Sequence, residues 1–156
     1  RSAMANPDAV SQLYLDSFGN VKVATATSVS LAATGNAVVT LPLVRGGLTN
    51  GGAVSNSGGV IIRKITVTSP AGDVSTANLA ISLGSNGNAG NLITANTVLT
   101  TLSAAGRYQD IAISGAYGAN TYVSGSTTST LFVTVNTASG NSNVVNISVF
   151  GDVVSF

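Results

Sequence analysis

The sequence lacks histidine, cysteine, tryptophan and glutamate altogether, and charged residues make up only 7% of its 156 positions. Without histidine or cysteine the chain has no imidazole base, no thiolate nucleophile and no thiolate metal ligand. The missing cysteines also exclude disulfide bonds. We therefore expect a protein that is not an enzyme, that needs no cofactor or metal ion, and that acts through its surface.

The few charged residues also indicate a protein without a catalytic site. Asp16, Asp73, Asp110 and Asp152 fall in turns or at strand ends, outside the Asp-Thr-Gly or Asp-Ser-Gly motifs of paired catalytic carboxylates. The net charge is only +1, so phosphate groups find no basic patch and nucleic-acid binding is not expected. Polar residues interrupt each apolar stretch long before the roughly 20 residues of a membrane-spanning helix, so no membrane partner is expected.

What the chain does contain is a two-residue periodicity. Large apolar residues alternate with small or polar ones, which is typical of half-buried β-strands, and turn-forming residues separate the runs. This pattern predicts an all-β fold, an antiparallel β-sandwich with a jelly-roll as first choice. The eight or nine expected strands lie near residues 12–16, 21–31, 37–44, 59–68, 74–83, 97–102, 108–114, 129–137 and 143–154.

The shared odd phase of several strands predicts which side chains face the core, because a slip of one residue would expose a whole set. The expected core residues are Leu79, Ile81, Leu83, Ile111, Ile113, Leu131, Val133, Val135, Val145, Ile147 and Val149.

Three local features refine this picture. The apolar phase switches across Arg63-Lys64, which predicts a β-bulge or a strand that passes between sheets. Pro42 cannot donate to a ladder, so its strand should lie at an edge or end there. The segment from Gly46 to Gly59 holds six glycines and reads as a long loop.

The length fits one domain, and no shift in composition marks a second. Residues 1–3 resemble a remnant of cloning ahead of Met4, and no signal-peptide segment follows them. We therefore expect a flexible N-terminal arm over residues 1–11 and a single sandwich domain over residues 12–156.

The densest polar cluster is Arg107-Tyr108-Gln109-Asp110. It could present Tyr108 and Arg107 to a glycan or to a partner chain, or it could simply open a strand, with Arg and Asp pairing across the sheet. Tyr117 and Tyr122 follow in the next loop, where a tyrosine can make a contact or pack on the sandwich end. These four residues, Arg107, Tyr108, Tyr117 and Tyr122, are the candidate surface-contact residues, and no catalytic residue is expected.

Five segments carry a family resemblance: Ile65–Gly72, Asn78–Gly84, Arg107–Ile111, Leu131–Asn136 and Val145–Val154. With their small polar strands, few charges and no cysteine, they resemble the small all-β virion proteins of tailed bacteriophages, namely capsid decoration, accessory head and fibre-head domains. The resemblance implies a jelly-roll or related sandwich, frequently trimeric, that binds a capsid lattice. No functional residue transfers position by position.

Two functions are therefore expected from the sequence. The first is a structural protein of a bacteriophage virion, such as a capsid decoration or accessory surface protein, whose partners are copies of itself and a capsid or other virion protein. The alternative is a carbohydrate-binding or adhesin-type module on a microbial surface, with a glycan as partner.

Overall fold

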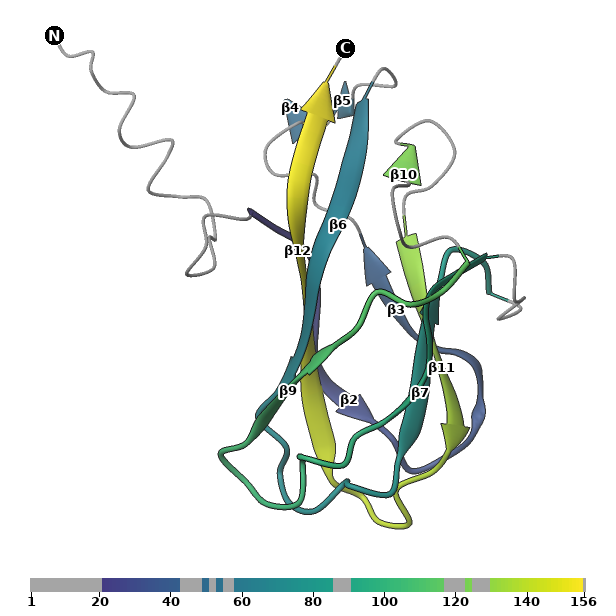
Figure 1. Ribbon diagram of the computed structural model, residues 1–156, viewed down its shortest axis with the longest axis vertical. Helices are drawn as coiled ribbons and strands as arrows, with labels where there is room; N and C mark the ends of the chain where they lie inside the picture. Colours follow the sequence, from purple (N-terminus) through teal and green to yellow (C-terminus); the bar gives the residue numbers. More distant parts are fainter. Residues whose placement is uncertain are drawn as a thin grey trace, which may run out of the picture.

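A computed structural model of the protein describes residues 21–42, 49–50, 53–54, 58–85, 91–116, 123–124 and 130–155. The described chain forms two antiparallel sheets that face each other, as Figure 1 shows. The first sheet contains β2 (Val21–Ser30), β6 (Gly58–Thr68), β9 (Tyr108–Ile111), β10 (Val123–Ser124) and β12 (Val144–Ser155). The second contains β3 (Gly35–Pro42), β7 (Asn78–Ser82), β8 (Leu92–Val98) and β11 (Thr130–Thr137).

The strand order identifies a jelly-roll. The first sheet runs β2-β12-β6 with β9 along the far edge of β6, and the second runs β3-β11-β7-β8. The pairs are nested: β7 pairs with β8, β6 with β9, β3 with β11, and β2 with β12. Eight strands wound in this way form the double-sheet jelly-roll, so the expected fold class is confirmed.

The core between the two sheets follows the alternation of the sequence. Nine of the eleven expected core residues are buried, and Leu83 and Ile113 are partly buried and pack against them. These strands are apolar toward the other sheet and mostly small or polar toward the outside, which is the alternation of a β-sandwich. The predicted core is therefore confirmed.

The phase switch in the sequence corresponds to a bulge in β6. Phe150 pairs with Lys64 and its neighbour Gly151 pairs with Ile62, so Arg63 is the extra residue. The Arg63 side chain donates from Nε to Asp152 Oδ2 at 3.0 Å, an exposed ion pair of the kind that contributes about 0–1 kcal/mol. The predicted bulge is confirmed.

The prediction that the strand of Pro42 lies at an edge or ends there is confirmed. Pro42 is the last residue of β3, and β3 is the edge strand of the second sheet. Within the predicted loop from Gly46 to Gly59, a short hairpin pairs β4 (Thr49–Asn50) with β5 (Ala53–Val54), and β6 already begins at Gly58. The loop prediction is thus corrected at its end, because its last glycines pair with β12. The predicted strand near 12–16 and the N-terminal arm lie outside the described residues.

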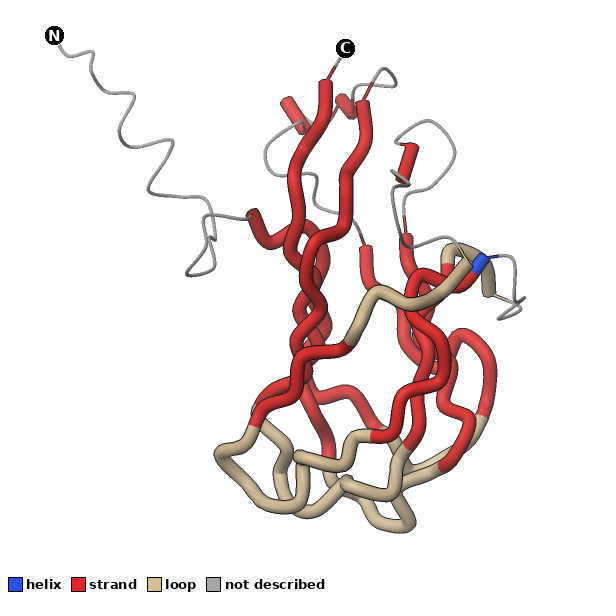
Figure 2. The backbone as a smooth tube through the Cα atoms, in the orientation of Figure 1, coloured by secondary structure: helices blue, strands red, loops and turns tan. Residues whose placement is uncertain are grey.

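Two strand predictions were wrong at one end of the sandwich. The strand expected near 97–102 is β8, and it ends at Val98; the strand expected from residue 74 begins at Asn78. The apolar residues that these two predictions placed in strands are buried in loops instead: Val74 and Ala77 before β7, and Leu99 and Leu102 after β8. Their backbones bond across the two loops, for example Val74 N to Leu102 O at 2.9 Å and Leu99 N to Ala77 O at 3.0 Å. These loops close the end of the core, as Figure 2 shows.

A crossing segment after β9 covers the outer edge of β8. Gly115 N donates to Ile93 O at 3.0 Å, and Thr94 Oγ1 donates to Ala112 O at 2.6 Å. A Cβ at Gly115 would lie 2.1 Å from Leu92 O, so only glycine permits this approach. The described part of the chain has no helix long and apolar enough to cross a membrane.

Asp73 stabilises the loop that precedes β7. Its Oδ1 accepts from the backbone N of Ser75 at 2.9 Å and from the Ser75 hydroxyl at 2.6 Å. These hydrogen bonds, that of the hydroxyl first, hold the pKa of the exposed Asp73 carboxyl below its usual value of 3.8. The ionised form therefore stabilises the fold at pH values above 3.8, and this contribution is lost as the pH falls through the lowered pKa.

We expect an Asp73→Asn variant to lose less stability than the native protein when the pH is lowered through this range, because the amide does not titrate. Urea unfolding followed by circular dichroism at a series of acidic pH values measures the difference. All other carboxyls are common to both proteins, so the difference reports Asp73 alone. Parallel pH profiles would contradict the assignment.

Candidate functional site

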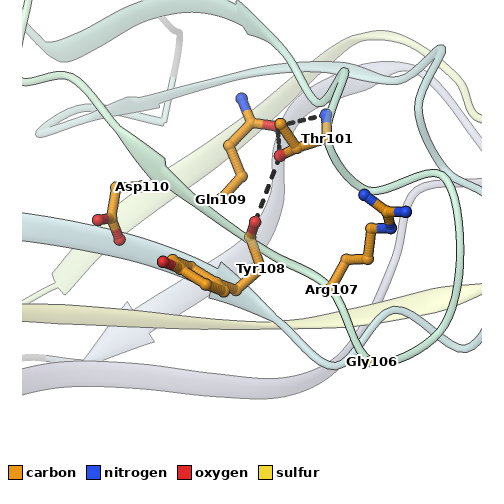
Figure 3. Close-up of a pocket in the computed structure, with 6 residues that line it drawn as sticks. All are labelled: Thr101, Gly106, Arg107, Tyr108, Gln109 and Asp110. Carbon is orange, nitrogen blue, oxygen red and sulfur yellow. Dashed lines mark hydrogen bonds between the residues drawn. The ribbon is translucent and has the colours of Figure 1, made fainter.

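The first candidate site is a hollow beside the start of β9, with a volume of about 700 Å³. We call it the Tyr hollow, and Figure 3 shows its lining residues. They are Thr101, Gly106, Arg107, Tyr108, Gln109 and Asp110. Two of the candidate surface-contact residues, Arg107 and Tyr108, are thus brought together here.

Gln109 gives this hollow its shape. Its side chain points inward from β9 and lies between β9 and the loop after β8. Gln109 Oε1 accepts from the backbone N of Thr101 at 3.2 Å and from the Thr101 hydroxyl at 2.9 Å. Gln109 Nε2 donates to Val98 O at 3.0 Å. The Gln109 amide therefore holds the start of this connection, at Val98 and Thr101, against β9. Near its other end Gly106, whose φ of +85° favours glycine, allows the turn back.

Asp110 and Arg107 do not pair as the sequence suggested. Asp110 faces outward opposite Thr66, and its Oδ1 accepts from the Thr66 hydroxyl at 2.8 Å. Among the described residues Arg107 makes no ion pair, and its side chain is exposed. The expected Arg–Asp pair across the sheet is therefore wrong: strand register places a threonine opposite Asp110.

Two large hydrophobic residues are exposed at the ends of the connection between β8 and β9. Tyr108 is 65% exposed and Val98 is 44% exposed, and they are the exposed large hydrophobic residues of the described chain. Val98 ends β8 and Tyr108 begins β9, so they stand at the two ends of one connection. An exposed tyrosine beside an arginine is the composition of a contact surface. Tyr117 and Tyr122 lie outside the described residues, so their part in this surface stays a prediction.

A second hollow, which the sequence did not predict, lies on the outer face of the second sheet and has a volume of about 360 Å³. Ala80 of β7 and Thr134 of β11, which pair across the sheet, lie within it. An amide bridge crosses β7, because Asn136 Nδ2 on β11 donates to Asn96 Oδ1 on β8. We call this the Asn-Thr hollow; its lining residues are Asn36, Ala80, Leu92, Ala95, Asn96, Thr134 and Asn136.

Among the described residues, few ionisable side chains line the two hollows. The Tyr hollow has one carboxylate, and the Asn-Thr hollow has no charged residue. Within the described ranges no three acidic residues gather where a metal ion could bind. The Tyr hollow offers an aromatic ring and a guanidinium, and the Asn-Thr hollow offers neutral amides and a threonine.

Comparisons with protein-family models, with curated proteins and with solved structures found no match to this chain.

Proposed function

We propose that this chain is a non-enzymatic structural protein of a virion surface, which assembles with copies of itself and binds a capsid. The observation that carries the proposal is the jelly-roll strand order in a chain with so few charges. Jelly-rolls recur in viral capsid domains, in lectins and in cupins. The tailed-bacteriophage resemblance supports the virion, the capsid partner and the trimer.

The Tyr hollow supports a contact surface for this assembly. Tyrosine and arginine are enriched among the residues that contribute most to protein interfaces, whereas lysine, glutamate and aspartate are depleted there. Here Tyr108, which lines the hollow, is 65% exposed, and Arg107 lines the hollow beside it. A neighbouring subunit would remove that surface from water, and cyclic symmetry would repeat the contact around an axis.

We expect light scattering at micromolar concentration to report a mass that is a small multiple of 15.4 kDa, with three copies as first choice. A Tyr108→Ala variant should shift the protein toward the monomer, since truncation at the centre of an interface costs about 2 kcal/mol or more. Thr40→Ala is the matched control, because Thr40 is exposed on the other sheet. A monomeric native protein that also fails to bind purified capsids would contradict the proposal and leave the adhesin alternative ahead.

The genes beside the coding sequence provide a second test. Capsid and portal genes in that position would support a virion protein. The adhesin alternative calls for aromatic residues on one face, yet Phe132 belongs to the second sheet, while Tyr108 and Phe150 belong to the first. Within the described chain that alternative therefore has no aromatic cluster to support it.

A further inference from the structure

We propose that the Asn-Thr hollow binds one neutral saccharide unit through hydrogen bonds to Thr134, Asn136 and Asn96. This inference goes beyond the proposed function and does not depend on it, because the hollow lies on the second sheet, away from the Tyr hollow on β9. It concerns a small-molecule site rather than an assembly surface.

The first step is an unpaired hydroxyl. Thr134 is only 6% exposed, and its Oγ1 has no hydrogen-bond partner among the described residues. The other such oxygen is Asn78 Oδ1, which lies at another outward position of the same sheet. Thr134 lines the hollow, and buried polar atoms are nearly always paired, so its unpaired hydroxyl marks a place for an absent partner.

The second step is the size and construction of the hollow. Ala80 is 3% exposed, and its single methyl group leaves space on the outer face of β7. Leu92 and Asn96 of β8 and Asn136 of β11 also line this space, and the Asn96–Asn136 bridge crosses β7. The volume of about 360 Å³ is at the lower end of small-molecule pockets, which span about 300–1,000 Å³.

The third step is the chemistry of the lining. Among the described residues no charged side chain lines the hollow, so a charged ligand would find no counter-ion there. The bridge uses one donor of Asn136 and leaves its Oδ1 as an acceptor, while Asn96 keeps its Nδ2 donors. Leu92, Ala95 and Ala80 add apolar contact. A sugar ring can contact all of these groups, because its adjacent hydroxyls form hydrogen bonds and its C–H face packs against apolar side chains.

A peptide fits this place less well. Peptides usually add a strand at an open sheet edge, where main-chain donors and acceptors are available. The hollow lies on a sheet face instead, over β7, whose backbone already pairs with β11 on one side and β8 on the other. A segment lying there could use only side chains, so a small polyol is the better occupant.

The test is a nuclear magnetic resonance titration of the ¹⁵N-labelled protein with glucose, galactose and N-acetylglucosamine, with sialic acid as the charged comparison. We expect a neutral sugar to shift amide signals of β7, β8 and β11 with a Kd on the order of 1 mM. Sialic acid should produce no such shifts. Immobilised oligosaccharides, tested in parallel, distinguish a free sugar from the end of a surface glycan.

Thr134→Val should weaken sugar binding about tenfold, as expected for one lost hydrogen bond, without lowering thermal stability, since it removes an unpaired buried hydroxyl. Ala80→Val should block binding by filling the floor. Thr40→Val makes the same chemical change at an exposed position outside the hollow and should bind normally.

Three results would overturn the proposal. One is the absence of shifts with all neutral sugars at roughly ten times the expected Kd. Another is equal binding by the Thr134→Val and Thr40→Val variants. The third is a Thr134→Val variant that is less stable while the native protein binds no sugar, which would mean that the hydroxyl bonds an ordered water only.

Discussion

Replacing Leu79 with alanine is expected to lower the free energy of unfolding by about 2–5 kcal/mol. Leu79 is fully buried in β7, between Val135 of β11 and Thr97 of β8. Because the strand is held on both sides, the backbone cannot move in to fill the cavity, and the cost should fall in the upper part of that range. The loss is a large fraction of the roughly 5–15 kcal/mol that stabilises a typical domain.

Leu83→Ala is the matched control for Leu79→Ala. It makes the same chemical change four positions along, at a residue that is only partly buried against the core. Urea unfolding followed by far-ultraviolet circular dichroism measures both variants, and the loss at Leu83 should be clearly smaller. Equal losses would contradict the burial of Leu79 and the inward phase of β7.

Replacing Gly151 with alanine should destabilise the protein by about 3 kcal/mol, the upper end of the usual cost of overpacking. A Cβ at this position would lie 2.0 Å from the carbonyl oxygen of Ile61 and 2.9 Å from its carbon. Both are backbone atoms of β6, which β12 holds along one edge and β9 and β10 along the other. Since β6 cannot withdraw, the bulge opposite Gly151 would have to rearrange.

Gly106→Ala separates this steric cost from the cost of backbone conformation. A Cβ at Gly106 would meet no atom within 4 Å, but the residue has a φ of +85°. The expected loss is therefore about 1 kcal/mol, that of a left-handed alanine. Thermal or urea unfolding of the two variants compares them directly. If Gly106→Ala lowered the free energy of unfolding more than Gly151→Ala does, the close approach of β12 to β6 could not explain the glycine at position 151.

Most of the fold could be predicted from the alternation of apolar with small or polar residues, because every strand of a sandwich follows this same pattern. Leu131, Val133 and Val135 face the core for the same reason as Val145, Ile147 and Val149, and a bulge appears in the sequence as a change of phase. The alternation predicted strands wrongly where apolar residues are buried in loops. Leu99 and Leu102 look like the continuation of a strand, yet they close the end of the core from a loop.

The sites were harder to predict, since each draws on residues that only strand register brings together. Arg107 and Tyr108 could be found as neighbours in sequence, but the partner of Asp110 depends on which residue of β6 stands opposite. The Asn-Thr hollow combines β3, β7, β8 and β11. Each member alone is an ordinary strand residue without a distinguishing motif: Ala80 and Thr134 alternate with core positions, and Asn96 is exposed on β8.

The nested strand pairs also determine when the chain can fold during synthesis. β11 lies between β3 and β7, and β12 lies between β2 and β6, so the last two described strands are interior strands of the two sheets. The outermost pair joins residues far apart, as in the bond from Ser28 N to Asn146 Oδ1, which spans 118 positions. The early strands therefore emerge from the ribosome before the strands with which they pair have been synthesised. The β7–β8 hairpin can form at once, but neither sheet closes until residues 130–155 have emerged, and such distant pairing is intrinsically slow.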